Sequence, residues 1–127
     1  MDKTLLVSID LEMGTEILRI LDEAGLKVRV ALWANLEEYA DWRLLISSRR
    51  LATDGLLDAY RQVNSALHAA GFPMEKKPAI MILPMTDPFI KELRRIFAKA
   101  RTVEGMRLGG QSIGGRWVED AFVYRIT

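Results

Sequence analysis

The sequence predicts an α+β domain in which three amphipathic helices and five strands build one mixed sheet. Apolar residues recur every three or four positions in three segments, while five other segments alternate or run continuously apolar. Glycine and proline mark most of the boundaries between these segments. The predicted order is α-β-β-α-β-α-β-β, with the helices mainly on one face so that their apolar stripes are buried. A length of 127 residues suits a single domain over residues 1–127.

The first helix is expected from about Asp10 to Ala24. Its apolar stripe has helical spacing and consists of Ile9, Met13, Ile17, Ile20, Leu21 and Ala24. Asp10 is suited to cap the start, and Gly25 is suited to end the helix in a left-handed conformation. Residues 4–9 fit either a short edge strand or a further helical turn.

A β-hairpin is expected next, formed by Leu26–Leu36 and Trp42–Ser47 around a five-residue loop over residues 37–41. Alternation places Val28, Val30 and Leu32 on one face of the sheet. If helices cover that face, the other face is open and carries Trp33, Leu45, Trp117, Ala121 and Val123. Exposed tryptophans on a sheet are typical of an interface. The alternative is that another segment, such as residues 4–9, folds over them.

The second helix is expected from about Asp54 to Ala70, with Thr53 or Asp54 as its cap and Gly71 at its end. Its apolar stripe consists of Leu56, Leu57, Tyr60, Val63, Leu67 and Ala70. The stretch Ala79–Leu83 shows no polar alternation. We therefore expect a central strand that is covered on both faces.

The third helix has the clearest start, because Asp87 can cap it and Pro88 suits the first helical position. We expect its apolar side to pack against the strand Ala79–Leu83 through Phe89, Leu93, Ile96 and Phe97. Its exposed side is basic, with Lys91, Arg94, Arg95, Lys99 and Arg101.

The last segment is expected to be a hairpin of Met106–Ile113 and Arg116–Ile126 around a Gly114-Gly115 turn. Gly109-Gly110 then marks a bulge or a place where another backbone approaches closely. Counting by twos places Asp120 on the apolar face of the last strand. A carboxylate there needs an arginine or backbone donors, or a bulge that turns it outward.

Composition narrows the possible functions. The chain has no cysteine and one histidine, so a disulfide framework, a cysteine nucleophile and a zinc site are not expected. We expect no cofactor and no metal. The N-terminal residues do not resemble a secretory signal, and the sequence lacks an apolar run long enough for a bilayer, so we expect a cytoplasmic protein without membrane contact.

The charges are unevenly distributed along the chain. Residues 10–41 hold eight acidic and three basic residues, whereas residues 42–101 hold eleven basic and five acidic ones, although the net charge is only +1. The candidate anion-binding residues are arginines, whose guanidinium groups suit phosphates and carboxylates. These are Arg49, Arg50, Arg94, Arg95 and Arg116.

Other polar residues form no diagnostic catalytic pattern. His68 is expected at the exposed end of the second helix, and Glu12 with Glu16 is expected on a solvated helix face. Asp41, Glu119 and Asp120 are candidate ligands of a magnesium-dependent nuclease, but their spacing matches no known motif. The glycines of residues 108–116 match neither of the phosphate-binding loops with a known spacing.

The sequence therefore favours a small non-enzymatic interaction protein, with a homodimer formed through the open sheet face as the leading hypothesis. The interface would consist of Trp33, Leu45, Trp117 and Val123. The alternative is a phosphate or nucleic-acid contact through the basic residues of the 42–101 segment. A third hypothesis is a hydrolase or nuclease that uses Asp41, Asp120 or His68 with the arginines.

Overall fold

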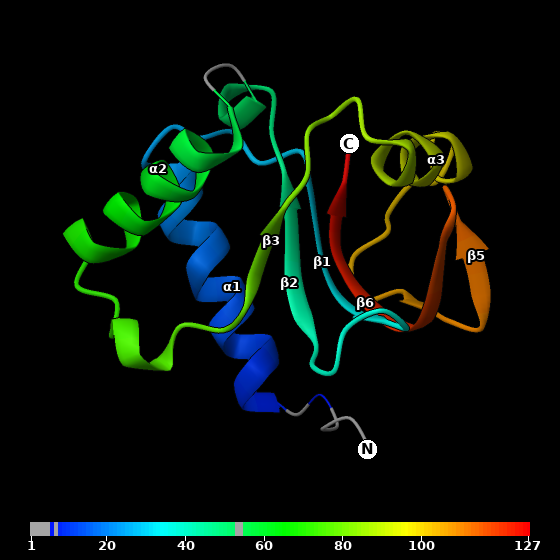
Figure 1. Ribbon diagram of the computed structural model, residues 1–127, viewed down its shortest axis with the longest axis horizontal. Coiled ribbons are helices and arrows are strands. Elements are labelled where there is room, and N and C mark those ends of the chain that lie inside the picture. The colour runs from blue at the N-terminus through cyan, green and yellow to red at the C-terminus, as the bar shows by residue number, and fades with distance from the viewer. Residues whose placement is uncertain (1–5, 7, 53–54) are drawn as a thin grey trace.

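The computed structural model describes residue 6 and the ranges 8–52 and 55–127, and it confirms the α+β class and the predicted order of elements. Two short 3-10 helices, Arg50–Ala52 (η1) and Met74–Lys76 (η2), flank the second helix. The helices and strands, labelled in part in Figure 1, are α1 (Ser8–Glu23), β1 (Val30–Leu36), β2 (Arg43–Ser47), α2 (Leu56–Ala69), β3 (Ile80–Ile82), α3 (Pro88–Ile96), β4 (Arg107–Leu108), β5 (Gln111–Ile113) and β6 (Arg116–Ile126).

The described strands form one mixed sheet in the order β3-β2-β1-β6-β4, with β5 also paired to β6. The pairs are antiparallel except for β2 with β3, which is parallel. The predicted strand Met106–Ile113 is split into β4 and β5 at Gly109-Gly110. A Cβ atom on Gly109 would lie 2.6 Å from the carbonyl oxygen of Glu119, so the expected close backbone approach is confirmed.

Helices cover both faces of the sheet. The helices α1 and α2 share one face, where they pack on Ala31, Trp33 and Leu44. On the other face α3 packs with Leu45 of β2, Val123 of β6 and further residues of β1 and β6 (Figure 1). The prediction of an open sheet face carrying Trp33, Leu45 and Val123 is therefore wrong, since these side chains are 2%, 0% and 0% exposed. The apolar residues on both sides of β1 were the signal of this double coverage.

The register of the hairpin also differs from the prediction. Leu32 lies opposite Leu45, and Trp33 lies opposite Leu44. This pairing is shifted by one residue from the pairing that a loop over residues 37–41 would give. A shift of one residue moves every side chain of a strand to the other face. Trp33 and Leu45 consequently lie on opposite faces.

Two bulges interrupt the alternation of β6. Its register with β1 passes from Val118 to Asp120 and from Val123 to Arg125, so Glu119 and Tyr124 are the additional residues. The buried face of β6 thus consists of Val118, Ala121, Val123 and Ile126. Asp120 does not lie on this apolar face, contrary to the count by twos; it is turned outward, where it forms an exposed ion pair with Arg107. Of the two expected alternatives, the bulge at Glu119-Asp120 is therefore the one confirmed.

The strand β3 lies at the edge of the sheet, so the prediction of a central strand is wrong. Its faces are nevertheless covered, because Ile80 and Ile82 join the core beneath α1 and α2, and Met81 packs against the other core. A continuous apolar run indicates that both faces of a strand are buried, but it does not indicate whether the strand is central or at the edge of the sheet. The amide of Ile82 donates to the hydroxyl of Tyr60 (3.0 Å), which occupies part of the exposed edge.

The helix α3 begins as predicted. Asp87 is its N-cap and accepts a hydrogen bond from the amide of Phe89 (2.9 Å), and Pro88 occupies the first turn. The expected packing against residues 79–83 holds only in part: Met81 and Leu83 share a core with Phe89 and Leu93, but the main contacts of α3 are with β5 and β6. Phe89 and Leu93 are buried, whereas the expected core residue Ile96 is 44% exposed and Phe97 is only partly buried.

The two longer helices follow their predictions closely. Gly25 and Gly71 end them with positive φ angles of 78° and 77°. Because α1 begins at Ser8, Asp10 lies in its first turn and is not the cap; residues 4, 5 and 7 lie outside the described residues. The candidate caps Thr53 and Asp54 also lie outside them. Of the predicted α2 stripe, Val63 and Leu67 are buried, while the first two positions, Leu56 and Leu57, are exposed.

A short hydrogen-bond chain holds α1 against the sheet. The indole N–H of Trp33 donates to the hydroxyl of Tyr124 (2.9 Å), and that hydroxyl donates to the carbonyl oxygen of Leu11 (2.6 Å). The helix can come this close because Gly14 has no side chain. A Cβ atom there would lie 2.2 Å from the Tyr124 hydroxyl oxygen. The bulge at Tyr124 directs its side chain to this point.

The hairpin turn provides a matched pair of substitutions. Gly114 and Gly115 both have positive φ, 54° and 87°. A Cβ on Gly114 would lie 2.5 Å from the carbonyl oxygen of Pro88, whereas a Cβ on Gly115 would have open space around it. We expect Gly115→Ala to cost about 1–2 kcal/mol through backbone strain alone. Gly114→Ala should cost about 1–3 kcal/mol more, because α3 has to shift. Urea unfolding of both variants measures the difference; equal midpoints would contradict the close packing of α3 on the turn.

The Tyr124 contact predicts a pH dependence. Tyr124→Phe leaves the buried indole N–H of Trp33 without its acceptor and should cost about 1–3 kcal/mol of stability near neutral pH.

Burial raises the pKa of Tyr124 above its ordinary value. The folded protein therefore holds this proton when the unfolded chain releases it, and stability is lost as pH rises above about 10. The Phe variant lacks this loss, so the stability gap between the two proteins should narrow above about pH 10. Urea unfolding at several pH values tests this, and a constant gap would refute it.

Candidate functional site: the basic end of the sheet

The topology gathers basic residues at one end of the sheet. The start of β1 lies beside the end of β2 and the end of β6, because Val30 is opposite both Ser47 and Ile126. Arg29 directly precedes β1, while Arg49 and Arg50 follow β2 after Ser48. All three arginines are exposed at this end. We define the basic end as Arg29, Arg49, Arg50, Lys91, Arg94, Arg95 and Lys99.

The helix α3 joins this end through Thr127. The guanidinium of Arg94 donates to the main-chain oxygen of Thr127 (2.9 Å), and that of Arg29 donates to its hydroxyl (3.1 Å). The amide of Thr127 in turn donates to the carbonyl oxygen of Arg29 (2.9 Å). The guanidinium groups of Arg29 and Arg94, which come from separate segments, thus both form hydrogen bonds to Thr127. The geometry fixes their orientation before any ligand binds.

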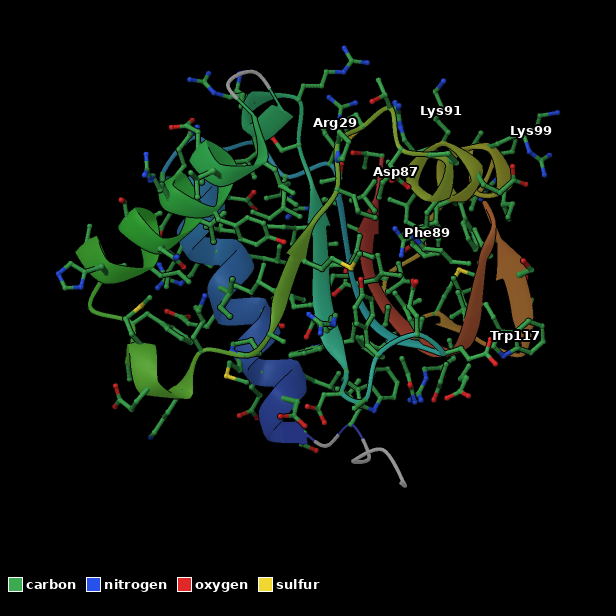
Figure 2. The ribbon with its side chains drawn as sticks, in the orientation of Figure 1. Arg29, Asp87, Phe89, Lys91, Lys99 and Trp117 are labelled. Atoms are coloured by element: carbon green, nitrogen blue, oxygen red, sulfur yellow. The ribbon has the colours of Figure 1, made fainter. Side chains whose placement is uncertain are left out.

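A shallow groove of about 500 Å³ lies beside this contact. Its polar walls are Lys91, Arg94 and Arg95, and its apolar surface consists of Phe97, Ala98, Ala100 and Ile126. Figure 2 shows Arg29, Lys91 and Lys99 toward the same end of the molecule. Cationic groups above an apolar floor suit a ligand that carries both an anionic and a flat apolar part.

The carboxylates of α3 are already engaged. Glu92 forms an ion pair with Arg95, and this hydrogen bond lowers the pKa of the Glu92 carboxyl and raises the pKa of the Arg95 guanidinium. Asp87 accepts the capping hydrogen bond from Phe89. Arg95 is therefore partly neutralised, whereas Lys91 and Lys99 extend into solvent as the sequence predicted.

Four of the five predicted anion-binding arginines, Arg49, Arg50, Arg94 and Arg95, lie in this region. Arg116 does not, because it begins β6 at the opposite end of the sheet and forms an ion pair with Glu38. Sequence reasoning missed Arg29. Its position just before a strand is the only local signal, and its role depends on the long-range pairing of β1 with β6.

The other candidate residues are not brought together. His68 is exposed near the end of α2, Asp41 lies in the β1–β2 loop, and Asp120 is paired with Arg107. Within residues 6, 8–52 and 55–127, no group of three or more His, Asp or Glu side chains is arranged to hold a metal ion.

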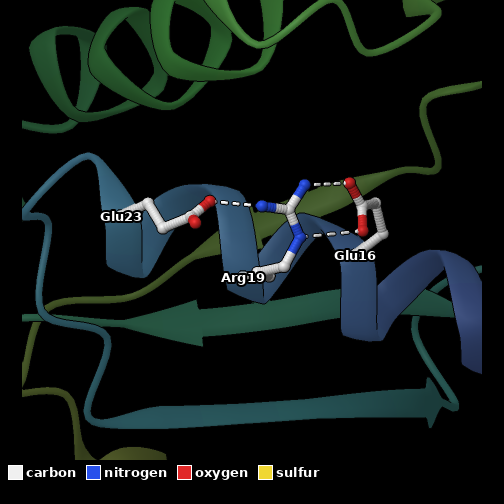
Figure 3. Close-up of polar contacts among 3 residues, drawn as sticks. All are labelled: Glu16, Arg19 and Glu23. Carbon is white, nitrogen blue, oxygen red and sulfur yellow. Dashed lines mark hydrogen bonds and ion pairs between the residues drawn. The ribbon is translucent and has the colours of Figure 1, made fainter.

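The exposed face of α1 carries an ion-pair network. The guanidinium of Arg19 binds the carboxylates of both Glu16 and Glu23 (Figure 3). The hydrogen bond from Arg19 lowers the pKa of Glu16 and raises the pKa of Arg19 itself. Glu16 is thus paired with a cation instead of forming a carboxylate pair with Glu12. The solvated helix face predicted for these residues is confirmed.

Of the four predicted interface residues, only Trp117 is exposed, at 43%. It lies near the start of β6, opposite Ser112 of β5. None of the described helices is long and apolar enough to cross a membrane.

Comparison of the chain with protein-family models, with curated proteins and with solved structures gave no match. Function therefore has to be inferred from the geometry of the residues themselves.

Proposed function

We propose that the basic end binds the phosphate backbone of a nucleic acid. The observation that carries this proposal is the convergence of Arg29, Arg49 and Arg50 with the basic face of α3 at one end of the sheet. These residues come from three separate segments, and Figure 2 shows Arg29, Lys91 and Lys99 spread along one end of the molecule. A surface of this extent contacts several phosphates along a polymer more readily than one isolated anion.

The modest net charge of +1 limits the affinity that we expect for a nucleic acid. A dedicated nucleic-acid binder is usually strongly basic overall. Here the positive charge is concentrated at one end, so we propose a small number of phosphate contacts and a correspondingly moderate affinity. The partly buried Phe97 beside Arg94 supplies an apolar surface on which a base can rest.

Salt dependence tests this proposal. Each phosphate contact on duplex DNA contributes a slope of about −0.9 in log affinity against log salt, so three contacts give about −2.7. Affinity should then fall roughly 40-fold between about 50 and 200 mM salt. Fluorescence anisotropy with labelled mixed-sequence duplex DNA and single-stranded RNA measures both quantities. An absence of binding to either polymer at low salt would refute the proposal.

Matched lysine variants locate the contact. Lys91→Gln removes one charge from the basic end and should make the slope shallower by about 0.9. Lys76→Gln removes one charge from η2, which lies away from that end in Figure 1, and should leave the slope unchanged. Both side chains are exposed, so neither change should alter folding. Equal effects of the two substitutions would argue for nonspecific attraction instead of a defined site.

A second candidate function rests on Trp117. We propose self-association through this side chain, reduced from the four-residue interface that the sequence predicted, because an indole that is 43% exposed is typical of an interface. Trp117→Glu should abolish dimers, while Leu57→Glu, at a residue that is 68% exposed on α2, should not. Sedimentation at micromolar concentration measures the state. A monomeric wild-type protein would rule out the dimer.

A further inference from the structure

A pocket of about 280 Å³ lies at the end of the sheet opposite the basic end. Its lining comes from Leu6, the first turns of α1, the strand β1, the β1–β2 loop and the segment that precedes β3. Figure 1 shows these segments at the lower end of the molecule. Its lining consists of Leu6, Asp10, Met13, Trp33, Asp41, Trp42, Pro78 and Ala79.

The walls are mostly apolar and aromatic. The indole N–H of Trp33 is already bonded to Tyr124, so this residue presents ring surface to the pocket. Trp42 and Met13 are partly buried and add a second indole and a thioether. Tryptophan is the side chain whose face attracts cations most strongly. The thioether of methionine adapts to the shape of an apolar group.

The charged side chains among the described residues of the lining all have one sign. Asp10 and Asp41 are acidic, and none of the described residues that line the pocket is basic. The two carboxylates come from different elements, α1 and the β1–β2 loop. An anion would be repelled here, and a neutral apolar molecule would not use the carboxylates. A cation with an apolar body uses both the carboxylates and the indole rings.

We propose that this pocket binds a small organic cation, namely an ammonium group attached to an apolar or aromatic body. Its volume of about 280 Å³ is slightly below the usual range for ligand pockets, about 300–1,000 Å³, and this limits the ligand to a small molecule. A bare divalent metal would find few oxygen ligands, since most of the lining is carbon and the described residues contain no group of three or more His, Asp or Glu suited to a metal. This site is separate from the basic end and does not depend on nucleic-acid binding.

The three tryptophans of the chain provide the readout. In ¹H–¹⁵N spectra, titration with benzyltrimethylammonium should shift the indole N–H signals of Trp33 and Trp42 in a saturable manner. The signal of Trp117, which is exposed on β6, should stay in place and serves as an internal control. Benzyl alcohol and benzoate, which have similar rings without the positive charge, should bind at least about tenfold more weakly.

Substitution of the carboxylates completes the test. Asp41→Asn in the exposed loop, and separately Asp10→Asn, should each weaken binding about 3- to 10-fold. Glu75→Gln, an exposed acid in η2, should leave the affinity unchanged. Lys91→Gln should also leave it unchanged, which separates this site from the basic end. Equal affinity for benzoate or benzyl alcohol, an unchanged affinity in both Asn variants, or no shift of the Trp33 and Trp42 signals would overturn the proposal.

Discussion

The contact of Tyr124 with Trp33 and the main chain of α1 is the constraint on which much of the structure depends. It joins β6, β1 and α1 at one point, and it requires three separate features: the bulge at Tyr124, the glycine at position 14 and a tryptophan on the facing strand. With α1 held there, one face of the sheet is closed. Phe122 packs edge-on against Tyr124 beside this contact, with ring centroids 5.4 Å apart. The walls of the small pocket, which include Trp33 and Met13, are fixed by the same contact.

Sequence patterns predicted the features of this fold that depend on local chemistry. Asp87-Pro88 specifies a helix start through a side-chain acceptor and a fixed φ angle, and Gly114-Gly115 specifies a turn through two positive φ angles. The bulge beside Asp120 was also predictable as one of two alternatives, because a carboxylate counted onto an apolar face needs either a partner or a bulge that turns it outward.

The relations between strands were not predictable in the same way. A shift of one residue between β1 and β2 placed Trp33 and Leu45 on opposite faces, and two bulges changed the alternation of β6. The apolar run of β3 fits an edge strand as well as a central one once both of its faces are covered. The same limitation applies to the candidate site. Arg49-Arg50 and Arg94-Arg95 were recognisable in the sequence as pairs. Only the tertiary fold brings them near Arg29 and places Arg116 at the opposite end of the sheet.

The placement of charge at the two ends has a consequence for how the molecule moves toward a partner. The basic end and the pocket with Asp10 and Asp41 lie at opposite ends of the strands. If the basic end binds a nucleic acid as proposed, attraction between this end and the polymer acts within a Debye length, about 8 Å at physiological ionic strength, and turns the basic end toward the polymer. In that orientation the pocket faces solvent. Under the two proposals together, a small molecule would enter or leave the pocket while the basic end is occupied.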